Sequence, residues 1–280
     1  MKSKNDEIMK RFISFSGGVE STTMCLLYGK GAIALVSDTG DEEPEMYDRW
    51  DFVENAMKII HDGDFEMVRI KPSVKHKGVV YHTLDDLSLA YGIFPGTMRR
   101  WCTKYLKIQA IDNYLKNQGE CELMIGLNAD EIDMREGNQS TLKNVSYTTP
   151  LVEDGYTRKD CIDHLHEYDL EPNFPPYMKR GGCRKCFFRG KKEAKAKYFF
   201  NKDGFLEDQA FEIKLNEDGT RKLNKSGFKK FYGINAGFPG GYQTVVDECE
   251  QEIAMFGLEQ MKSQYKNITE HKACGVFCHR

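Results

Sequence analysis

The sequence predicts an α/β fold: a doubly wound, mainly parallel sheet with helices on both faces, followed by a C-terminal appendage that contains cysteines. Two observations predict it. Between residues 12 and 127, short apolar runs of strand length alternate with helical segments, the order that builds a parallel sheet through right-handed crossovers. The run at 32–37 is almost continuously apolar, as in a strand buried on both faces.

The predicted elements follow one another closely. A strand at 12–15 passes through a glycine loop into a helix at 19–28, which Gly29 and Gly31 end. A strand at 32–37, a helix at 45–61, a strand at 65–70, a loop-rich stretch, a helix at 104–117 and a strand at 123–127 follow. These elements predict a nucleotide-binding α/β domain over residues 1–150.

The pattern changes after Pro150, so residues 151–280 are assigned to a separate C-terminal region. A helix is expected at 157–168, and prolines and glycines then interrupt the chain around Cys183 and Cys186. Residues 189–230 are rich in Lys, Asn, Asp and Gly and predict an exposed, partly irregular segment. A last helix is predicted near 244–266.

Composition restricts the class of protein. Of the residues, 40% are hydrophobic and 30% are charged, and the formal net charge is −3, so no basic excess supports a nucleic-acid partner. Lysines near 189–197 are the one local candidate for such a surface, and runs of this kind are usually solvated helix faces. No apolar run reaches the ~20 residues of a membrane span, and no signal peptide is seen at the start. We therefore expect a cytoplasmic protein without a membrane partner. Nine cysteines then indicate thiols, metal sites or catalysis rather than disulfides.

The glycine loop carries the strongest functional prediction. It follows the first strand and opens the first helix, where main-chain amides and a helix N-terminus can hold phosphate. Gly17 and Gly18 allow a close approach of the backbone to an anion, and Ser16, Ser21 and Thr22 add hydroxyl groups. The loop lacks the lysine and the spacing of a Walker A motif.

The loop sequence Ser-Gly-Gly-Val-Glu-Ser at 16–21 resembles the pyrophosphatase loop (PP-loop) of the adenine-nucleotide α-hydrolase-like superfamily. Glu20 stands where the superfamily usually has Asp. Three more segments resemble the phosphoadenosine phosphosulfate reductase-like proteins of that superfamily, in the same order along the chain. They are Asp38-Thr39-Gly40 with Pro44 and Glu45, Arg100-Trp101-Cys102-Thr103 with Lys107, and the stretch from Gly126 to Asp130 and Glu131 with Arg135 downstream.

The resemblance implies an ATP or related adenine-nucleotide site. It assigns nucleotide contacts to Ser16, Gly17, Gly18, Glu20, Ser21, Thr22, Asp38, Thr39, Gly40, Arg100, Lys107, Gly126, Asp130, Glu131 and Arg135. Carboxylates after parallel strands suit Mg²⁺, so Asp38, Asp130 and Glu131 are its candidate ligands. The cations around Cys102 suit phosphate and are expected to lower the pKa of that thiol, which makes Cys102 a candidate catalytic residue.

Two pairs of cysteines define the remaining chemistry. Cys183 and Cys186 have the spacing that lets two thiolates share one metal, and Cys274 and Cys278 would complete a set for Zn²⁺ or an iron-sulfur cluster. The tail also resembles the Cys-Gly-x-His end of sulfonucleotide reductases, in which the cysteine is the nucleophile and a redox partner releases the product. In that alternative Cys274 is catalytic.

Three hypotheses remain open at the level of sequence. In the first, the enzyme adenylates an unknown acceptor and transfers sulfur to it, with release of pyrophosphate. In the second, it reduces a sulfated nucleotide through Cys274. In the third, it binds a nucleotide without turnover, as a sensor.

Overall fold

The computed structural model describes residues 9–134, 142–217, 231–235 and 237–268. Its centre is a sheet of five parallel strands in the order β3-β2-β1-β6-β7. The strands are β1 (Lys10–Ser14), β2 (Ala32–Ser37), β3 (Phe65–Ile70), β6 (Cys121–Ile125) and β7 (Val145–Thr148). The predicted parallel sheet is therefore confirmed, and β7 is a strand that the sequence pattern did not predict.

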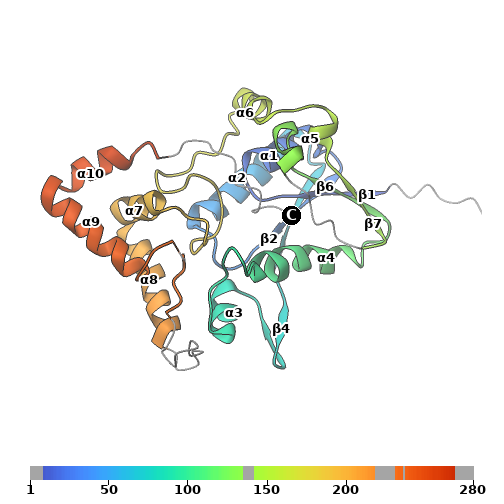
Figure 1. Cartoon of the computed structure of the whole chain (residues 1–280). Helices are drawn as coiled ribbons and strands as arrows, with labels where there is room; N and C mark the ends of the chain where they lie inside the picture. The colour runs from blue at the N-terminus through green and yellow to red at the C-terminus, as the bar shows by residue number, and fades with distance from the viewer. Residues whose placement is uncertain (1–8, 135–141, 218–230, 236, 269–280) are drawn as a thin grey trace, which may run out of the picture.

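Helices cover both faces of the sheet (Figure 1), because successive strand residues point to opposite sides. Ile13 and Met124 belong to the core shared with α1 (Val19–Tyr28), α2 (Pro44–Ile60) and α6 (Arg158–Glu167). Phe12 and Leu123, their neighbours in the chain, belong to the core on the side of α4 (Gln109–Leu115). The doubly wound fold class predicted from the sequence is confirmed.

Several local expectations need correction. The stretch predicted as loop-rich contains the hairpin of β4 (Val74–His76) and β5 (Val79–Tyr81) and the helix α3 (Leu84–Tyr91). The helix predicted at 104–117 begins as a π-helix, η1 (Cys102–Ile108), and continues as α4. A 3₁₀ helix, η2 (Ala129–Met134), follows β6, and the short helix α5 (Pro150–Glu153) follows β7.

The prediction of an exposed, partly irregular segment at 189–230 is wrong for the part that ends at residue 217. Helices α7 (Lys191–Phe200) and α8 (Lys202–Glu217) occupy it, and they pack with α9 (Tyr242–Phe256) and α10 (Leu258–Tyr265) into a helical cluster beside the sheet (Figure 1). The predicted last helix is thus two helices, which meet at Gly257, where φ is +81°. Phe205 stacks on Tyr242 in the centre of this cluster, with ring centroids 4.7 Å apart.

The predicted boundary at residue 150 stays a prediction. Leu151, Cys161 and Leu165, which lie beyond it, are fully buried in the same core as Ile13 and Cys25. The expectation that Cys25 and Cys161 are core residues is confirmed. In the described part of the chain, no helix combines the length and the apolar character needed to cross a membrane.

Candidate functional site: an anion loop beneath a cysteine-containing roof

The glycine loop lies at the carboxyl end of β1, the central strand of the sheet. The chain leaves β1 toward β2 on one side, and β6 lies on the other side, so the loop sits at a point where the strand order reverses. This is the position at which open α/β sheets bind ligands. Gly17 has a φ of +81° and Gly18 is the extended N-cap residue of α1, which together turn the chain from strand into helix.

The loop is held by its own hydroxyl groups. The amide of Ser16 donates to Oγ of Ser21 (3.2 Å), and the two serine hydroxyls lie 3.2 Å apart. The hydroxyl and amide of Thr22 both donate to the carbonyl of Gly18 (2.8 and 3.0 Å). Within the described ranges, no protein group accepts a hydrogen bond from the amides of residues 17–21. These amides are the unpaired donors of a helix N-terminus and can serve an anion.

Gly126 lies against this loop. A Cβ atom on Gly126 would lie 3.2 Å from the amide nitrogen of Ser21 and 3.4 Å from the carbonyl carbon of Glu20. The chain just after β6 therefore lies so close to the N-terminus of α1 that a side chain at position 126 would crowd the loop.

A cavity opens beside the loop at the carboxyl ends of β1 and β2. Its walls come from both strands, from α2, from η1 and from the loop that carries the cysteine pair. The residues that line it are Ser14, Phe15, Ser16, Val36, Ser37, Glu42, Trp50, Thr103, Lys107, Ile108, Ile111, Arg180, Gly181, Gly182, Cys183, Cys186, Arg189 and Glu193. A second cavity shares Thr103, Lys107, Cys183 and Cys186 with the first, and adds Thr39 and Cys102. The fold thus brings together six residues that the sequence singled out: Ser16, Thr39, Cys102, Lys107, Cys183 and Cys186.

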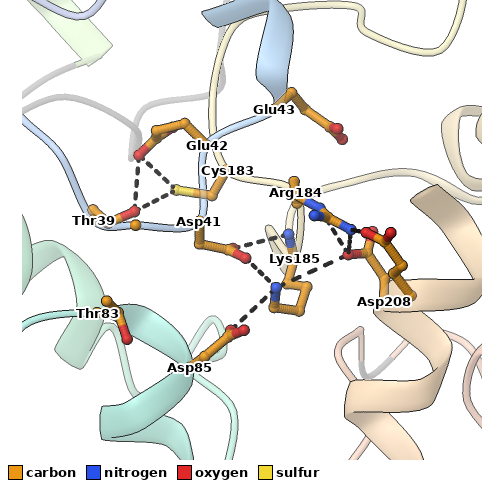
Figure 2. Close-up of polar contacts among 12 residues, drawn as sticks. Thr39, Asp41, Glu42, Glu43, Thr83, Asp85, Cys183, Arg184, Lys185 and Asp208 are labelled. Atoms are coloured by element: carbon orange, nitrogen blue, oxygen red, sulfur yellow. Dashed lines mark hydrogen bonds and ion pairs between the residues drawn. The ribbon is translucent and has the colours of Figure 1, made fainter. Parts of the chain in front are cut away.

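Residues 180–189, which include Cys183 and Cys186, form part of the wall of both cavities, and we call this segment the roof. Ion pairs connect it to the residues just before α2 (Figure 2). Lys185 forms ion pairs with Asp41 and with Asp85 (3.1 Å), and the backbone of Glu42 pairs with that of Cys183. Arg184 forms an ion pair with Asp208 (3.0 Å). Lys185, Asp41 and Asp208 are buried and Asp85 and Arg184 are partly exposed, and together these contacts hold the roof against the segment before α2, α3 and α8.

Two of the lysines near 189–197 have a role other than the one considered from the sequence. Lys197 has no exposed surface, and its Nζ lies 2.7 Å from Oε1 of Glu43 and 2.8 Å from Oδ2 of Asp208. Lys195 is also buried and is paired with Glu248 (2.8 Å) and Glu252 (2.6 Å). These two lysines are structural residues and do not form a surface for nucleic acid.

Two thiols at the site, those of Cys102 and Cys183, have raised pKa values. Burial raises the pKa of Cys102 to about 11, and Lys107 lowers it only in part. The expectation that nearby cations lower the pKa of Cys102 is therefore wrong, because the loss of hydration outweighs the positive charge. Burial and the carboxylate of Glu42 also raise the pKa of Cys183, whose thiol donates to that carboxylate (3.4 Å).

Other predicted residues lie outside the two cavities. Glu20 forms an ion pair with Arg158 and accepts from Nδ2 of Asn128 (3.0 Å). Asp38 accepts from the amide of Gly40 (2.9 Å) and from the hydroxyl of Tyr47 (2.9 Å). Gly40 has a φ of +68° and faces Thr83.

Asp130, Glu131 and Arg100 also lie outside the two cavities and contact neighbouring parts of the fold. Asp130 accepts from the amide of Arg158 (2.9 Å) at the start of α6. Glu131 is buried in η2. The guanidinium of Arg100 lies over the ring of Phe188, 5.3 Å from its centroid. Arg135, Cys274 and Cys278 lie outside the described residues.

Among the described residues, no group of three or more His, Cys, Asp or Glu side chains has an arrangement that could hold a metal ion. Asp38 and Asp130 each accept hydrogen bonds from groups of the protein, and the Mg²⁺ site stays a prediction. The set of four thiolates for zinc or an iron-sulfur cluster remains a prediction, since it depends on Cys274 and Cys278.

Sequence reasoning missed several residues of the cavity. Arg180, Arg189 and Glu193 flank the cysteine pair in the chain, and an inspection of charged residues near that pair would have found them. Trp50 carries no such signal, because its spacing on α2 is that of any buried position on an amphipathic helix.

Comparisons with known proteins give a distant structural similarity. No protein-family model matches the chain, and no curated protein matches it in sequence. Among solved structures, it is similar to phosphoadenylyl-sulfate (PAPS) reductase from Candida auris, solved as a phosphate complex. The TM-score is 0.42 and the sequence identity is 14%, over 59% of this chain and 75% of the other. A similarity this weak carries no argument about function.

Proposed function

We propose that the chain is a PP-loop enzyme that binds ATP or a related adenine nucleotide and adenylates an acceptor, with release of pyrophosphate. One observation carries the proposal. Ser16, at the start of a loop with unpaired amides, and the cation Lys107 line the same cavity at the carboxyl ends of β1 and β2. Phosphate oxygens placed there would meet amide donors on one side and a positive charge on the other.

The electrostatics of the cavity favour an anion. The N-terminus of α1 contributes a partial positive charge, and Lys107, Arg180 and Arg189 line the walls. Two carboxylates, Glu42 and Glu193, also line them, so three cationic residues stand against two carboxylates. Glu42 accepts from the hydroxyl of Thr39 (2.8 Å), and Glu193 accepts from the amide of Gly190 (3.0 Å).

In the proposed reaction, an oxygen of the acceptor attacks the α-phosphorus of ATP. A bond forms between these atoms, the bond from the α-phosphorus to the bridging oxygen breaks, and pyrophosphate departs with the negative charge. The loop amides and Lys107 would stabilise the charge that develops on the phosphate oxygens. The raised pKa values of Cys102 and Cys183 do not favour a thiolate nucleophile at either residue.

The order of the motifs supports the choice of nucleotide. Segments resembling the phosphoadenosine phosphosulfate reductase-like proteins contribute Thr39, Cys102 and Lys107 to adjoining cavities. In the reductase alternative the bound nucleotide is already sulfated and the nucleophile is Cys274.

Calorimetry and product analysis test the proposal together. Wild type and a Lys107→Met variant would be titrated with ATP, with sulfated adenine nucleotide and with adenosine. We expect ATP to bind to wild type, adenosine to bind at least about tenfold more weakly, and the variant to lose affinity for ATP. Lys202→Met, which changes an exposed lysine on α8, is the matched control. Sulfite release from the sulfated nucleotide would instead favour the reductase, and binding of none of these ligands would refute the proposal.

A further inference from the structure

Two residues that line the main cavity carry buried hydrogen-bond donors that have no partner among the described residues. These donors are Nε1 of Trp50 and Nη1 of Arg189. Trp50 is 2% exposed and Arg189 is 6% exposed. A buried donor without an acceptor costs roughly 1–3 kcal/mol, and native proteins rarely leave one in that state. Two such donors on the wall of one cavity indicate an acceptor-rich ligand.

The indole nitrogen of Trp50 lies beside the glycine loop. A Cβ atom on Gly17 would lie 3.2 Å from Nε1, so this N–H is next to the unpaired amides of residues 17–21. Packing holds the ring in place. Tyr47 meets it edge-on, with centroids 5.1 Å apart, and the guanidinium of Arg69 lies 5.8 Å from its centroid. Trp50 therefore adds a rigid donor to the anion loop.

The guanidinium of Arg189 is fixed by an ion pair that leaves part of it unused. Its Nη2 donates to Oε1 of Glu43 (2.5 Å), and Lys197 binds the same carboxylate. The backbone is also anchored, because Nδ2 of Asn235 donates to the carbonyl of Arg189 (2.6 Å). Nη1 of Arg189 is therefore a second donor that no described group satisfies, on a residue that lines the cavity.

We propose that Trp50 and Arg189 are ligand-binding residues and that the cavity takes an oligophosphate, with one phosphate at the loop and Trp50 and a further phosphate at Arg189. This inference rests on the proposed nucleotide function and narrows its ligand class. Under this proposal, a single phosphate or sulfate ion would occupy one of the two places. Pyrophosphate and the triphosphate of ATP would occupy both.

The test uses inorganic pyrophosphate, inorganic phosphate and ATP as probes of the full chain. Trp50→Phe keeps an aromatic ring and removes the donor, and Arg189→Lys keeps the positive charge beside Glu43 and removes Nη1. The control is Trp101→Phe, because Nε1 of Trp101 is also buried without a partner but Trp101 lines neither cavity described above. Thermal melts would establish that each variant is folded.

We expect wild type to bind pyrophosphate at least about tenfold more tightly than phosphate. Trp50→Phe and Arg189→Lys should each weaken binding of pyrophosphate and ATP by about tenfold or more, as expected for the loss of a hydrogen bond to a charged group. Trp101→Phe should stay within about twofold of wild type. The chain has two tryptophans, so in Trp101→Phe the emission comes from Trp50 alone, and pyrophosphate should change it.

The possible failures are distinguishable. If wild type binds ATP but Trp50→Phe and Arg189→Lys bind pyrophosphate as wild type does, this inference is wrong and the proposed function stands. If wild type binds neither ATP nor pyrophosphate, the proposed function is wrong as well. Should a variant fail to fold, unchanged emission of Trp50 in the Trp101→Phe protein at saturating pyrophosphate would still overturn the role of Trp50.

Discussion

The buried ion pairs of Lys197 with Glu43 and Asp208 give a quantitative prediction for the Lys197→Met variant. Lys197 has no exposed surface and contacts two carboxylates that are themselves buried, Glu43 and Asp208. Removing one partner of a buried ion pair leaves uncompensated charge and costs about 3–5 kcal/mol. Glu43 keeps Arg189 and Asp208 keeps Arg184, so we expect the lower end, about 3 kcal/mol.

The assay is urea and thermal denaturation followed by circular dichroism. A loss of about 3 kcal/mol corresponds to a fall of roughly 6–12 °C in melting temperature for a chain of this size class. The matched control is Lys202→Met, the same substitution in a pair of the same N–O distance, 2.7 Å, with half-exposed side chains on both sides. Such exposed pairs contribute about 0–1 kcal/mol. Equal stabilities of the two variants would refute the claim that the buried ion pairs of Lys197 with Glu43 and Asp208 stabilise the fold.

Three further predictions concern the site. Gly17→Ala should weaken ATP binding by about tenfold and destabilise the fold by about 1–2 kcal/mol. The reason is that φ is +81° at this position and a Cβ atom would lie 2.8 Å from Cε of Met46. Calorimetry and thermal melting test this prediction, and an unchanged affinity for ATP would contradict it. Glu20→Ala should lower the free energy of unfolding by about 2 kcal/mol but leave the affinity for ATP within about threefold of wild type. The reason is that Glu20 pairs with Arg158 outside the cavity. A large loss of ATP affinity in a folded variant would place Glu20 at the ligand instead. Alkylation of Cys102 should rise about tenfold per pH unit from pH 8 to pH 10, because its pKa of about 11 keeps it protonated there; a plateau by pH 9, measured by peptide mass spectrometry, would show an ordinary thiol.

The central part of the fold could be predicted because its signals are local. An apolar run, two glycines and an amphipathic helix specify β1, the loop and α1 without reference to the rest of the chain. The same holds for β2 and β3, whose bounds match the predicted ranges.

The remainder depends on partners that are distant in sequence. The lysines of α7 look solvent-exposed from composition, but Glu43, 154 residues from Lys197, makes burial of that charge possible. The partner of Glu20 is Arg158, 138 residues away. The loop sequence alone therefore could not explain why Glu stands at position 20 where the superfamily usually has Asp. The pKa of Cys102 was misjudged for the same reason, since burial is a property of the tertiary structure.

The central claim is that the amides of residues 17–21 bind phosphate oxygens of an adenine nucleotide. A crystal structure of the protein with a non-hydrolysable ATP analogue tests it most directly. We predict phosphate oxygens about 2.7–3.2 Å from at least two of these amide nitrogens, with Lys107 on the same phosphate chain. A well-ordered nucleotide whose phosphates lie away from this loop would contradict the claim.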